Sequence, residues 1–478
     1  MIVRYRNLVG AGAPDGIDEE QNVNPSDVTD VIGVVPVSDR RVAAAAIAAA
    51  REAAPGWARS PLQQRFDVLD AAGAEVLARR AELGRLLASE EGKPIAEAIG
   101  EVTRAGNVLK FFAGETVRPR GEMMASVRAG MTVEVTREPI GVVGIVTPWN
   151  FPLAIPTWKI APALAWGNTV VFKPAQSTPG CAWELVSILR RAGLPDGVLN
   201  LVYGRGSVVG EEIVGSPQVD AISFTGSVGV GRDLIARSAA TGKRVQAEMG
   251  GKNPTIVVDD ADLDLAVEAC ANSAYFSTGQ RCTASSRLIV TEGIHDRFVE
   301  ALVTRMRSMR VGHALDPETV VGPVVDDAQL RQDLRYIALA VEEGAEVIGG
   351  DRVESDTVGY FLAPALALGT DNAMTINREE VFGPVASVIR VVDYAEALSV
   401  ANDTPFGLSA GICTTSLATA AHFKRNSEAG MVMVNAPTAG VDYHVPFGGS
   451  KGSSYGPREQ GTAAGEFYSR TKTAYVNA

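Results

Sequence analysis

The stretch Val142-Val143-Gly144-Ile145-Val146-Thr147-Pro148-Trp149-Asn150 joins an apolar run of strand length to a turn stiffened by proline. More short apolar runs follow it, and helical segments separate them. The runs are 169–172, 197–202 and 221–224, and the helical segments between them include 179–191 and 208–215. Apolar strands that alternate with helices predict a parallel sheet covered on both faces. We therefore expect an α/β domain that continues from about residue 140.

A second α/β series starts near residue 254 and predicts a second domain of the same kind. Its expected strands are 255–258, 286–290, 346–348, 386–391 and 431–435, and its expected helices are 263–277, 295–309, 395–402 and 416–426. The chain before residue 140 reads as helical at 38–54, at 61–90 and, after a Gly-Lys-Pro turn at 92–94, to about residue 112.

Two segments outside these series alternate polar and apolar residues. The run 131–138 is rich in β-branched residues, and the tail 467–476 alternates in the same way. We expect the two to pair as strands.

Composition limits the possible functions. A chain of 478 residues is long enough for two or more domains, and 46% hydrophobic with 21% charged residues excludes wholesale disorder. A net charge of -12 without a basic stripe argues against nucleic acid as a partner and suits a cytoplasmic protein. The N-terminus lacks the apolar core of a signal peptide, and no apolar stretch is long enough to span a membrane.

The cysteines and histidines give no sign of a metal site. The four cysteines form no C-x-x-C pair, and the four histidines lack H-E-x-x-H spacing. We therefore expect no metal, no disulfide framework and no Ser-His-Asp triad.

Cys282 stands in a polar stretch, 277–286, that contains Gly279 and places Arg281 directly before the cysteine. Most lone cysteines are inert core residues. Small polar neighbours predict instead a reachable sulfur, and the adjacent cation favours its thiolate, which is the reactive form. Cys282 is therefore a candidate nucleophile.

Polar residues at the ends of the expected strands could serve such a nucleophile. Asn150 would suit an oxyanion site, Glu248 a general base, and Lys173 a ligand contact. Each also has an ordinary interpretation as a turn or surface residue. The turn at 224–231 places small residues at a helix start, where phosphates bind, although it lacks the G-x-G-x-x-G pattern and is equally consistent with an ordinary glycine-rich turn.

Taken in order, these segments resemble the aldehyde dehydrogenase superfamily over essentially the whole chain. The matching segments are 148–152, 173–175, 224–227, 248–251, 279–282, 380–384 and 446–453. The resemblance implies two Rossmann-type α/β domains and a small β element for oligomerisation. The dinucleotide-binding domain would comprise 1–118 and 141–250, the catalytic domain 251–458, and the oligomerisation element 119–140 and 459–478. Such proteins are usually homodimers or homotetramers.

The same resemblance assigns roles to residues. Cys282 would attack the aldehyde, and the Asn150 amide with the Cys282 backbone N–H would hold the oxyanion. Glu248 would activate the water that cleaves a thioester, and Lys173 would hold a ribose. The implied contacts to NAD or NADP are Thr147, Pro148, Trp149, Lys173, Gln176, Gly206, Phe224, Thr225, Gly226, Ser227, Gly231, Glu380 and Phe382.

Cofactor preference and substrate are suggested by smaller features. Family members that prefer NAD often carry an acid where this chain has Gln176, so NADP should be tolerated. The stretches 279–287 and 452–460 resemble the subgroup that oxidises 2,5-dioxopentanoate (2-oxoglutarate semialdehyde). Alternatives are succinate or glutarate semialdehyde, a broad aldehyde range, a CoA-acylating enzyme, or a catalytically silent protein of this fold.

A substrate with a carboxylate calls for a cation in its pocket. Arg281 is the candidate, although it could equally lower the pKa of Cys282 or bond to a neighbouring loop. By resemblance, the substrate pocket would be lined by Phe151, Trp158, Phe276, Arg281, Pro437 and Phe447.

Overall fold

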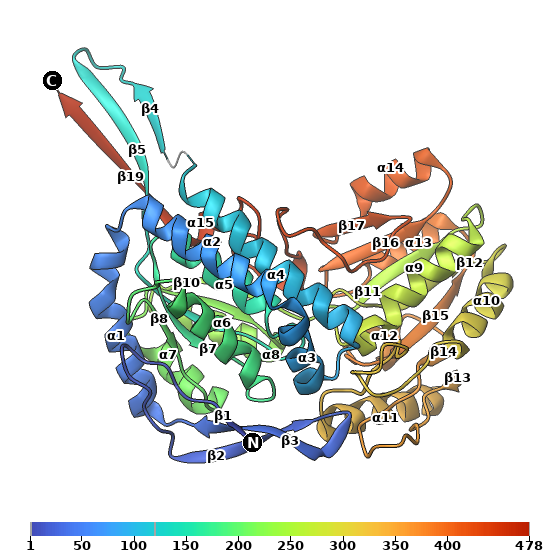
Figure 1. Ribbon diagram of the computed structural model, residues 1–478. Coiled ribbons are helices and arrows are strands. Elements are labelled where there is room, and N and C mark those ends of the chain that lie inside the picture. The colour runs from blue at the N-terminus through green and yellow to red at the C-terminus, as the bar shows by residue number, and fades with distance from the viewer. Residues whose placement is uncertain (1, 119–120, 478) are drawn as a thin grey trace.

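Two helix-covered sheets form the body of the computed structural model, which describes residues 2–118 and 121–477 (Figure 1). The first sheet has the strand order β18-β10-β9-β6-β7-β8. Its strands are β6 (Val142–Val146), β7 (Thr169–Lys173), β8 (Leu199–Leu201), β9 (Ala221–Thr225), β10 (Arg244–Glu248) and β18 (Ser454–Tyr455). All neighbours pair in parallel except β18, which runs antiparallel to β10.

Alternate side chains of these strands enter two different cores, as the two-residue repeat of a strand requires. Val143 and Ile145 face one core, and Val142 faces the other. The first core is completed by α2 (Leu62–Ala78), α3 (Arg80–Glu91), α4 (Ile95–Thr116), α5 (Ala154–Ala165) and α6 (Pro179–Arg191). The second is completed mainly by α1 (Arg40–Ala58), α7 (Glu211–Gly215), which follows a π-helical turn at Gly206–Gly210, and α8 (Val228–Ala239). The predicted parallel sheet with helices on both faces is confirmed.

The predicted single helix over 61–90 is wrong, because the helix is interrupted at Arg79. Arg79 leaves helical geometry with φ -95° and ψ 13°, so α2 ends before it and α3 begins after it. Its guanidinium donates to Glu184 of α6 at 2.8 Å. The bend lets two amphipathic segments pack on α4 and α6, a tertiary effect that periodicity alone does not reveal.

The second sheet has the order β13-β14-β15-β12-β11-β16-β17. Its strands are β11 (Asn253–Val257), β12 (Ser285–Thr291), β13 (Glu346–Gly349), β14 (Ala365–Thr370), β15 (Val385–Val391), β16 (Ser409–Cys413) and β17 (Met431–Val434). Its helices are α9 (Leu263–Tyr275), α10 (His295–Arg307), α11 (Asp327–Glu342), α12 (Thr375–Arg378), α13 (Tyr394–Asn402) and α14 (Leu417–Asn426). Strands β14 and β16 were not predicted. The helix expected over 263–277 stops at Tyr275, where a 3-10 turn (Phe276–Gly279) follows.

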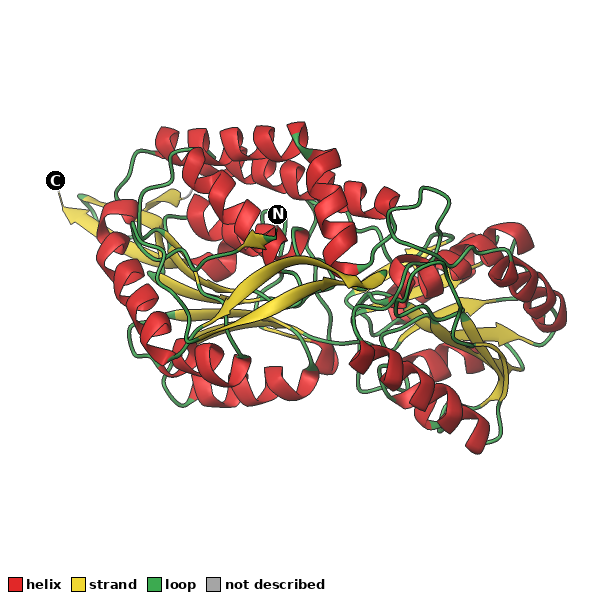
Figure 2. Ribbon diagram, turned by 60° about the horizontal axis from the view of Figure 1, so that its bottom comes forward, coloured by secondary structure: helices red, strands yellow, loops and turns green. Residues whose placement is uncertain are grey.

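Two smaller sheets complete the fold. β19 (Ser469–Asn477) pairs antiparallel with β5 (Met131–Pro139), which pairs with β4 (Gly121–Ala125). The predicted pairing of the tail with 131–138 is therefore confirmed, and this arm projects from the body (Figure 1). β1 (Val3–Arg4), β2 (Asp18–Asn24) and β3 (Asp27–Val37) form a ribbon that runs from the first domain towards the second (Figure 2). Val28 N–H in β3 donates at 2.8 Å to the backbone oxygen of Val358, which lies between β13 and β14 of the second domain.

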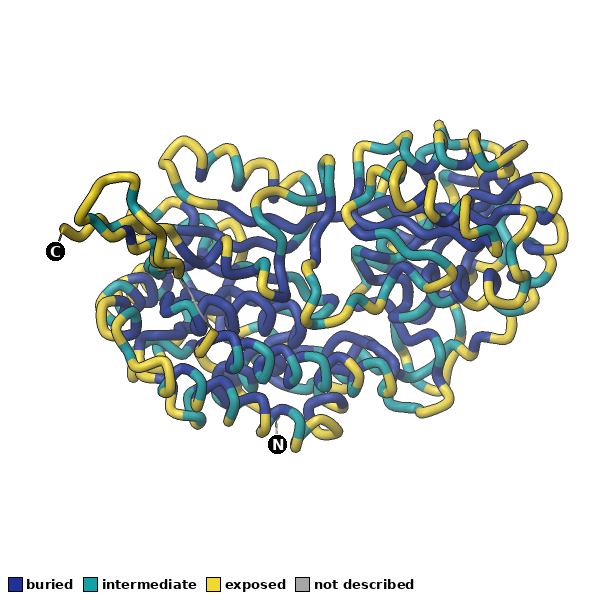
Figure 3. The backbone as a smooth tube through the Cα atoms, turned by 90° about the horizontal axis from the view of Figure 1, so that it is seen from above, coloured by how far each residue is buried: buried dark blue, intermediate teal, exposed yellow. Residues whose placement is uncertain are grey.

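Figure 3 shows a buried centre in each of the two large domains and an exposed arm beside them. The proposed domain limits remain predictions, but the structure differs from them in two places. β18 joins the first sheet although it lies within 251–458, the range predicted for the catalytic domain. The short helix α15 (Ala464–Tyr468) packs into the first core, not into the arm. Among the described residues, no helix is long and apolar enough to cross a membrane, and no cluster could hold a metal.

Candidate active site

Cys282 follows a turn in which three successive residues adopt the left-handed backbone conformation, which is rare for residues other than glycine. Ser277, Thr278 and Gly279 all have positive φ, between 51° and 66°. The carboxylate of Glu97 on α4 holds this turn by accepting from Ser277 N at 3.0 Å and Ser277 Oγ at 2.5 Å. A Cβ at position 279 would lie 2.1 Å from Gly383 O, so glycine is required there. The turn therefore sets the entry of the chain to Cys282.

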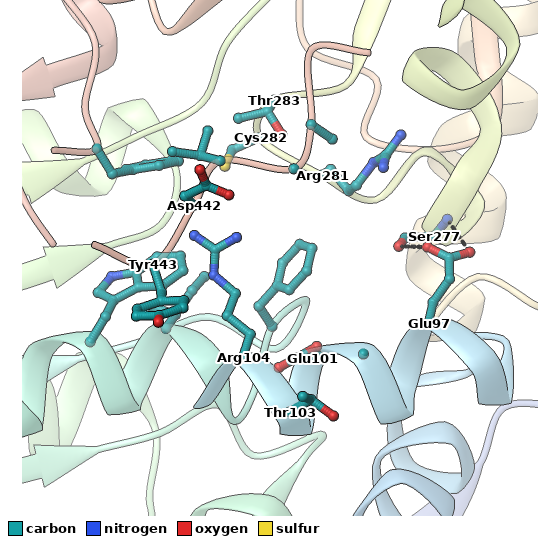
Figure 4. Close-up of a pocket in the computed structure, with 18 of the residues that line it drawn as sticks. Glu97, Glu101, Thr103, Arg104, Ser277, Arg281, Cys282, Thr283, Asp442 and Tyr443 are labelled. Atoms are coloured by element: carbon teal, nitrogen blue, oxygen red, sulfur yellow. Dashed lines mark hydrogen bonds between the residues drawn. The ribbon is translucent and has the colours of Figure 1, made fainter. Parts of the chain in front are cut away.

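Two cavities meet at Cys282. One, of about 430 Å³, lies between α4 and the loop 439–443, and Figure 4 shows the side chains that line it. The other, of about 360 Å³, lies between the ends of the first sheet and residues 380–382. Cys282 lines both, so a substrate in one cavity and a cofactor in the other would approach the same sulfur.

Asn150 is held through both its side-chain amide and its backbone oxygen. Its Nδ2 donates to Gln280 O at 2.9 Å, and its backbone oxygen accepts from Lys93 Nζ at 2.7 Å. The side chain is buried and lines the second cavity together with Cys282. A fixed amide beside a nucleophile is what an oxyanion site requires.

Lys93 was missed as a site residue by sequence reasoning. Its Nζ donates to Glu101 Oε2 at 2.6 Å and lies 3.8 Å from the Phe151 ring centroid. Glu101 Oε1 in turn accepts from Leu153 N at 3.0 Å and from Ala154 N at 3.1 Å. Burial opposes the charge of Lys93, but the carboxylates of Glu101, Glu91 and Glu97 together outweigh burial, so the pKa of Lys93 is raised. This buried pair anchors the 150–154 turn, and the Gly-Lys-Pro motif at 92–94 was its only signal.

Glu248 ends β10 in a buried site. Its Oε2 accepts from Ser454 Oγ at 2.5 Å. Burial, and then the nearby Glu459 carboxylate, raise the pKa of Glu248 well above its usual range. A raised pKa makes the ionised carboxylate a stronger base. The geometry is therefore compatible with the predicted role as a base.

Glu459 and Lys159 form a buried pair near Glu248, and sequence reasoning did not predict either residue as part of the site. Glu459 accepts from Trp158 Nε1 at 2.6 Å and forms a buried ion pair with Lys159. Lys159 Nζ also donates to Ser223 Oγ at 3.0 Å. The only sequence signal was a lysine in the otherwise apolar α5, because its partner lies 300 residues away.

The expected activation of Cys282 by Arg281 is wrong for this structure. Burial, and then the Glu380 and Glu248 carboxylates, raise the pKa of Cys282 to about 12. Arg281 instead donates through Nη2 to the backbone oxygens of Asn272 and Ser273. Cys282 is half-buried, and its surroundings favour the neutral thiol.

This raised pKa gives a testable pH dependence. Below about pH 10, the rate at which iodoacetamide inactivates the cofactor-free enzyme should rise about tenfold per pH unit, because only the thiolate reacts. Glu248→Gln removes one of the charges that raise the pKa, so at pH 9 it should be alkylated faster than the unchanged protein. A plateau in the alkylation rate below pH 8 would contradict the raised pKa.

The second cavity has features that fit a dinucleotide. Thr225, which lines this cavity, and Thr147, which directly precedes the lining residue Pro148, each have a buried Oγ1 without a hydrogen-bond partner among the described residues. Ser227 precedes α8 in an extended conformation and does not cap the helix with its side chain, so the helix N-terminus stays open to a phosphate. A Cβ at Gly250 would lie 2.0 Å from Glu380 Oε2. The Glu380 carboxylate therefore fits in this position only because residue 250 is a glycine. Bound NAD or NADP would supply the hydride acceptor.

The predicted cofactor residues divide into two groups. Those that line the second cavity are Pro148, Trp149, Thr225, Gly226, Ser227, Glu380 and Phe382. Phe382 packs edge-on against Trp149, with ring centroids 5.5 Å apart. The residues outside this lining are Thr147, Lys173, Gln176, Gly206, Phe224 and Gly231. Phe224 lies beneath Gly226, where a Cβ would meet its ring at 2.6 Å, so it packs under the turn.

Lys173 and Gln176 lie at the end of β7. Lys173 Nζ donates to Pro174 O at 2.7 Å, and burial lowers its pKa to about 8. Gln176 Nε2 donates to Glu20 Oε2 of β2 at 2.9 Å, and Glu20 lies 3.7 Å from Arg205. Gln176 itself is neutral, but Glu20 supplies a carboxylate next to it.

The predicted substrate residues are only partly brought together. Phe151, Trp158, Arg281 and Phe447 line the first cavity. Phe276 and Pro437 are not among its lining residues, and Phe276 packs against the core of the second domain instead. Arg104, Asp442 and Tyr443 line the cavity but were not predicted (Figure 4).

A sulfur that lines two cavities, one of which has features that fit a dinucleotide, is compatible with an oxidoreductase that uses a cysteine. The chain belongs to the aldehyde dehydrogenase family, which matches residues 13–474. It is 43% identical to the alpha-ketoglutaric semialdehyde dehydrogenase of Bacillus subtilis over 95% of this chain and 93% of that one. It is 38% identical to the 2,5-dioxopentanoate dehydrogenase of Saccharolobus solfataricus, over 98% and 99% of the two chains.

A solved structure gives the same result for the fold. The crystal structure of an NAD-dependent aldehyde dehydrogenase from Sinorhizobium meliloti superposes with a TM-score of 0.96 at 37% identity, and the match covers 99% of this chain and 95% of that one. The predicted fold class and the predicted NAD(P)-dependent oxidation of an aldehyde are confirmed.

Proposed function

We propose that the protein oxidises 2,5-dioxopentanoate to 2-oxoglutarate. The observation that carries this proposal is a cavity at the nucleophile that combines apolar walls with two arginines, the buried Arg281 and the half-buried Arg104. Apolar walls suit the methylene groups of a semialdehyde, and a guanidinium suits a carboxylate at its far end. Two relatives that cover nearly the whole chain carry names for this same activity.

The chemistry follows from the residues around Cys282. The sulfur, once it has lost its proton, forms a bond to the aldehyde carbon, and the new oxyanion accepts from the Asn150 amide and the Cys282 backbone N–H. Bound NAD(P) would supply the hydride acceptor, and loss of hydride from the carbon would restore the carbonyl as a thioester on Cys282. Glu248 then takes a proton from water, the water oxygen bonds to the carbon, and the carbon–sulfur bond breaks. The product is a carboxylate, and Cys282 is free again.

A substrate panel tests this proposal. kcat/KM is measured with 2,5-dioxopentanoate, succinate semialdehyde, glutarate semialdehyde and pentanal, by following the absorbance of reduced cofactor. We expect 2,5-dioxopentanoate to give the highest value and pentanal the lowest. A higher value with succinate or glutarate semialdehyde would favour the second candidate, and equal values throughout would indicate a broad-specificity enzyme. No reduced cofactor with any aldehyde would indicate a silent protein of this fold.

We propose that NAD and NADP are both accepted, and that Glu20 limits the use of NADP. Its carboxylate bonds to Gln176, near the position proposed for the adenosine ribose, where it would repel a 2′-phosphate. Glu20→Gln should lower the KM for NADP about threefold to fivefold, since a partly exposed charge contact is typically worth up to ~1 kcal/mol. The KM for NAD is the internal control and should change less than twofold. An unchanged KM ratio would remove Glu20 from cofactor choice.

The arm formed by β4, β5 and β19 supports a proposal about assembly. It exposes apolar side chains, and Met123 is 77% exposed. Its outer strands also present unpaired backbone groups, which favour pairing with another chain. We expect a homodimer or homotetramer, which light scattering on the purified protein would test. The expected cytoplasmic location remains a prediction from composition.

A further inference from the structure

Arg104 occupies an unusual position in the substrate cavity. It projects from α4 towards Cys282 and the loop that carries Asp442 (Figure 4). Its Nη2 donates to Gln460 Oε1 at 2.9 Å, and its Cζ lies 5.5 Å from the Trp158 ring centroid. Its Nε is buried and has no hydrogen-bond partner. The guanidinium is therefore oriented by neutral neighbours and keeps unused donors.

No carboxylate among the described residues forms an ion pair with Arg104. Burial lowers the pKa of Arg104, and the fields of Glu101 and Asp442 oppose that shift. Guanidinium nevertheless stays charged in proteins. Arg104 is half-buried, and a cation partly withdrawn from water without a paired anion carries a desolvation cost that an anionic ligand would relieve.

The other two cations of the cavity are already engaged. Lys93 is bonded to Glu101 and to the backbone oxygen of Asn150. Arg281 also has a buried Nε without a partner, but its Nη2 donates to two backbone oxygens of α9. Figure 4 shows its guanidinium directed away from Cys282. Of these three cations, Arg104 is the one that presents free donors to the cavity beside the nucleophile.

The acids of the cavity are either hydrogen-bonded or exposed to solvent. Glu101 accepts from Lys93 and from the backbone of α5, and Glu97 accepts from Ser277. Asp442 remains, on the loop opposite Arg104. It is exposed, so water and salt screen its charge more than the charge of a carboxylate bound against Arg104.

We propose that Arg104 binds the carboxylate of the substrate and thereby selects acidic aldehydes. The proposal rests on the proposed function and identifies the residue that reads the far end of the substrate. It transfers this role from Arg281, the residue suggested by sequence, to a residue on α4. Two parallel N–H donors of a guanidinium match the two oxygens of a carboxylate, which gives direction as well as charge.

The test compares one variant on two substrates of equal chain length. Arg104→Gln should lower kcat/KM for 2,5-dioxopentanoate about 30- to 100-fold, mainly through KM, as expected for loss of a charge-assisted contact. For pentanal, which has no carboxylate, kcat/KM should change less than threefold, and this activity also shows that the variant is folded. Arg104→Lys keeps the charge but not the fork, so it should lie between the two.

Two further variants serve as matched controls. Arg281→Gln should affect 2,5-dioxopentanoate and pentanal equally. Asp442→Asn should raise kcat/KM for the acidic substrate relative to pentanal, because it removes a charge that repels the substrate carboxylate. A loss with Asp442→Asn as large as with Arg104→Gln would overturn the proposal in favour of an Arg104–Asp442 contact that only shapes the cavity. If the unchanged enzyme does not prefer the acidic aldehyde to pentanal, the proposed substrate class fails, and the role of Arg104 with it. If the preference exists and Arg104→Gln leaves it intact, only the role of Arg104 is overturned.

Discussion

Glu248→Gln should release about one equivalent of reduced cofactor per active site in a fast burst and then turn over ~100-fold or more slowly. Hydride transfer does not need the base, because it follows attack by Cys282. Cleavage of the thioester does, since water is a poor nucleophile until a proton is removed. Stopped-flow absorbance of reduced cofactor, followed by acid trapping of the acyl-enzyme, measures both phases.

The stability of the same variant provides its control. A carboxyl whose pKa is raised in the folded protein ionises there only at a higher pH than it does in the unfolded chain. This difference favours unfolding from mildly acidic pH upwards, so the amide of Glu248→Gln removes that cost at neutral pH. The variant should therefore unfold at the same or a higher temperature. Slow turnover without a burst would instead place Glu248 at an earlier step.

Asn150→Ala should lower kcat by ~10²- to 10³-fold and change KM little, because an oxyanion donor acts on charge that develops only after attack. Among the described residues, the Asn150 side chain bonds only to Gln280 O, whereas the backbone oxygen of Asn150 accepts from Lys93. Alanine therefore keeps the contact that anchors the turn. Steady-state kinetics with 2,5-dioxopentanoate, together with a thermal melt that should shift little, measure the effect. A large rise in KM with unchanged kcat would mean that Asn150 binds substrate in the ground state instead.

Much of this architecture could be predicted from local patterns. Apolar runs such as 142–146 and 221–224 became central strands, because a strand buried on both faces needs an unbroken apolar run. The break at Arg79 could not be predicted, since two helical patterns meet there without proline or glycine. It depends on packing against α4 and α6, which lie elsewhere in the chain.

The same limit applies to the site. The motifs around Cys282, Asn150 and Glu248 were visible because several rare segments occur in one order. The partners of Lys159 and Arg104 lie 300 and 356 residues away in sequence, so no local pattern joins them. Local reading also gave the wrong direction for the pKa of Cys282, because Arg281 is its neighbour in sequence while burial and two distant carboxylates decide its charge.

The neutral sulfur at the meeting point of the two cavities has a consequence for the resting protein. Peroxide oxidises cysteine through the thiolate, and the first product, sulfenic acid, can proceed to forms that thiols do not restore. A catalytic cysteine that ionises readily would be exposed to this damage whenever the enzyme is idle. Here the idle sulfur keeps its proton, so the protein carries a reactive residue through oxidising conditions in a form that resists them.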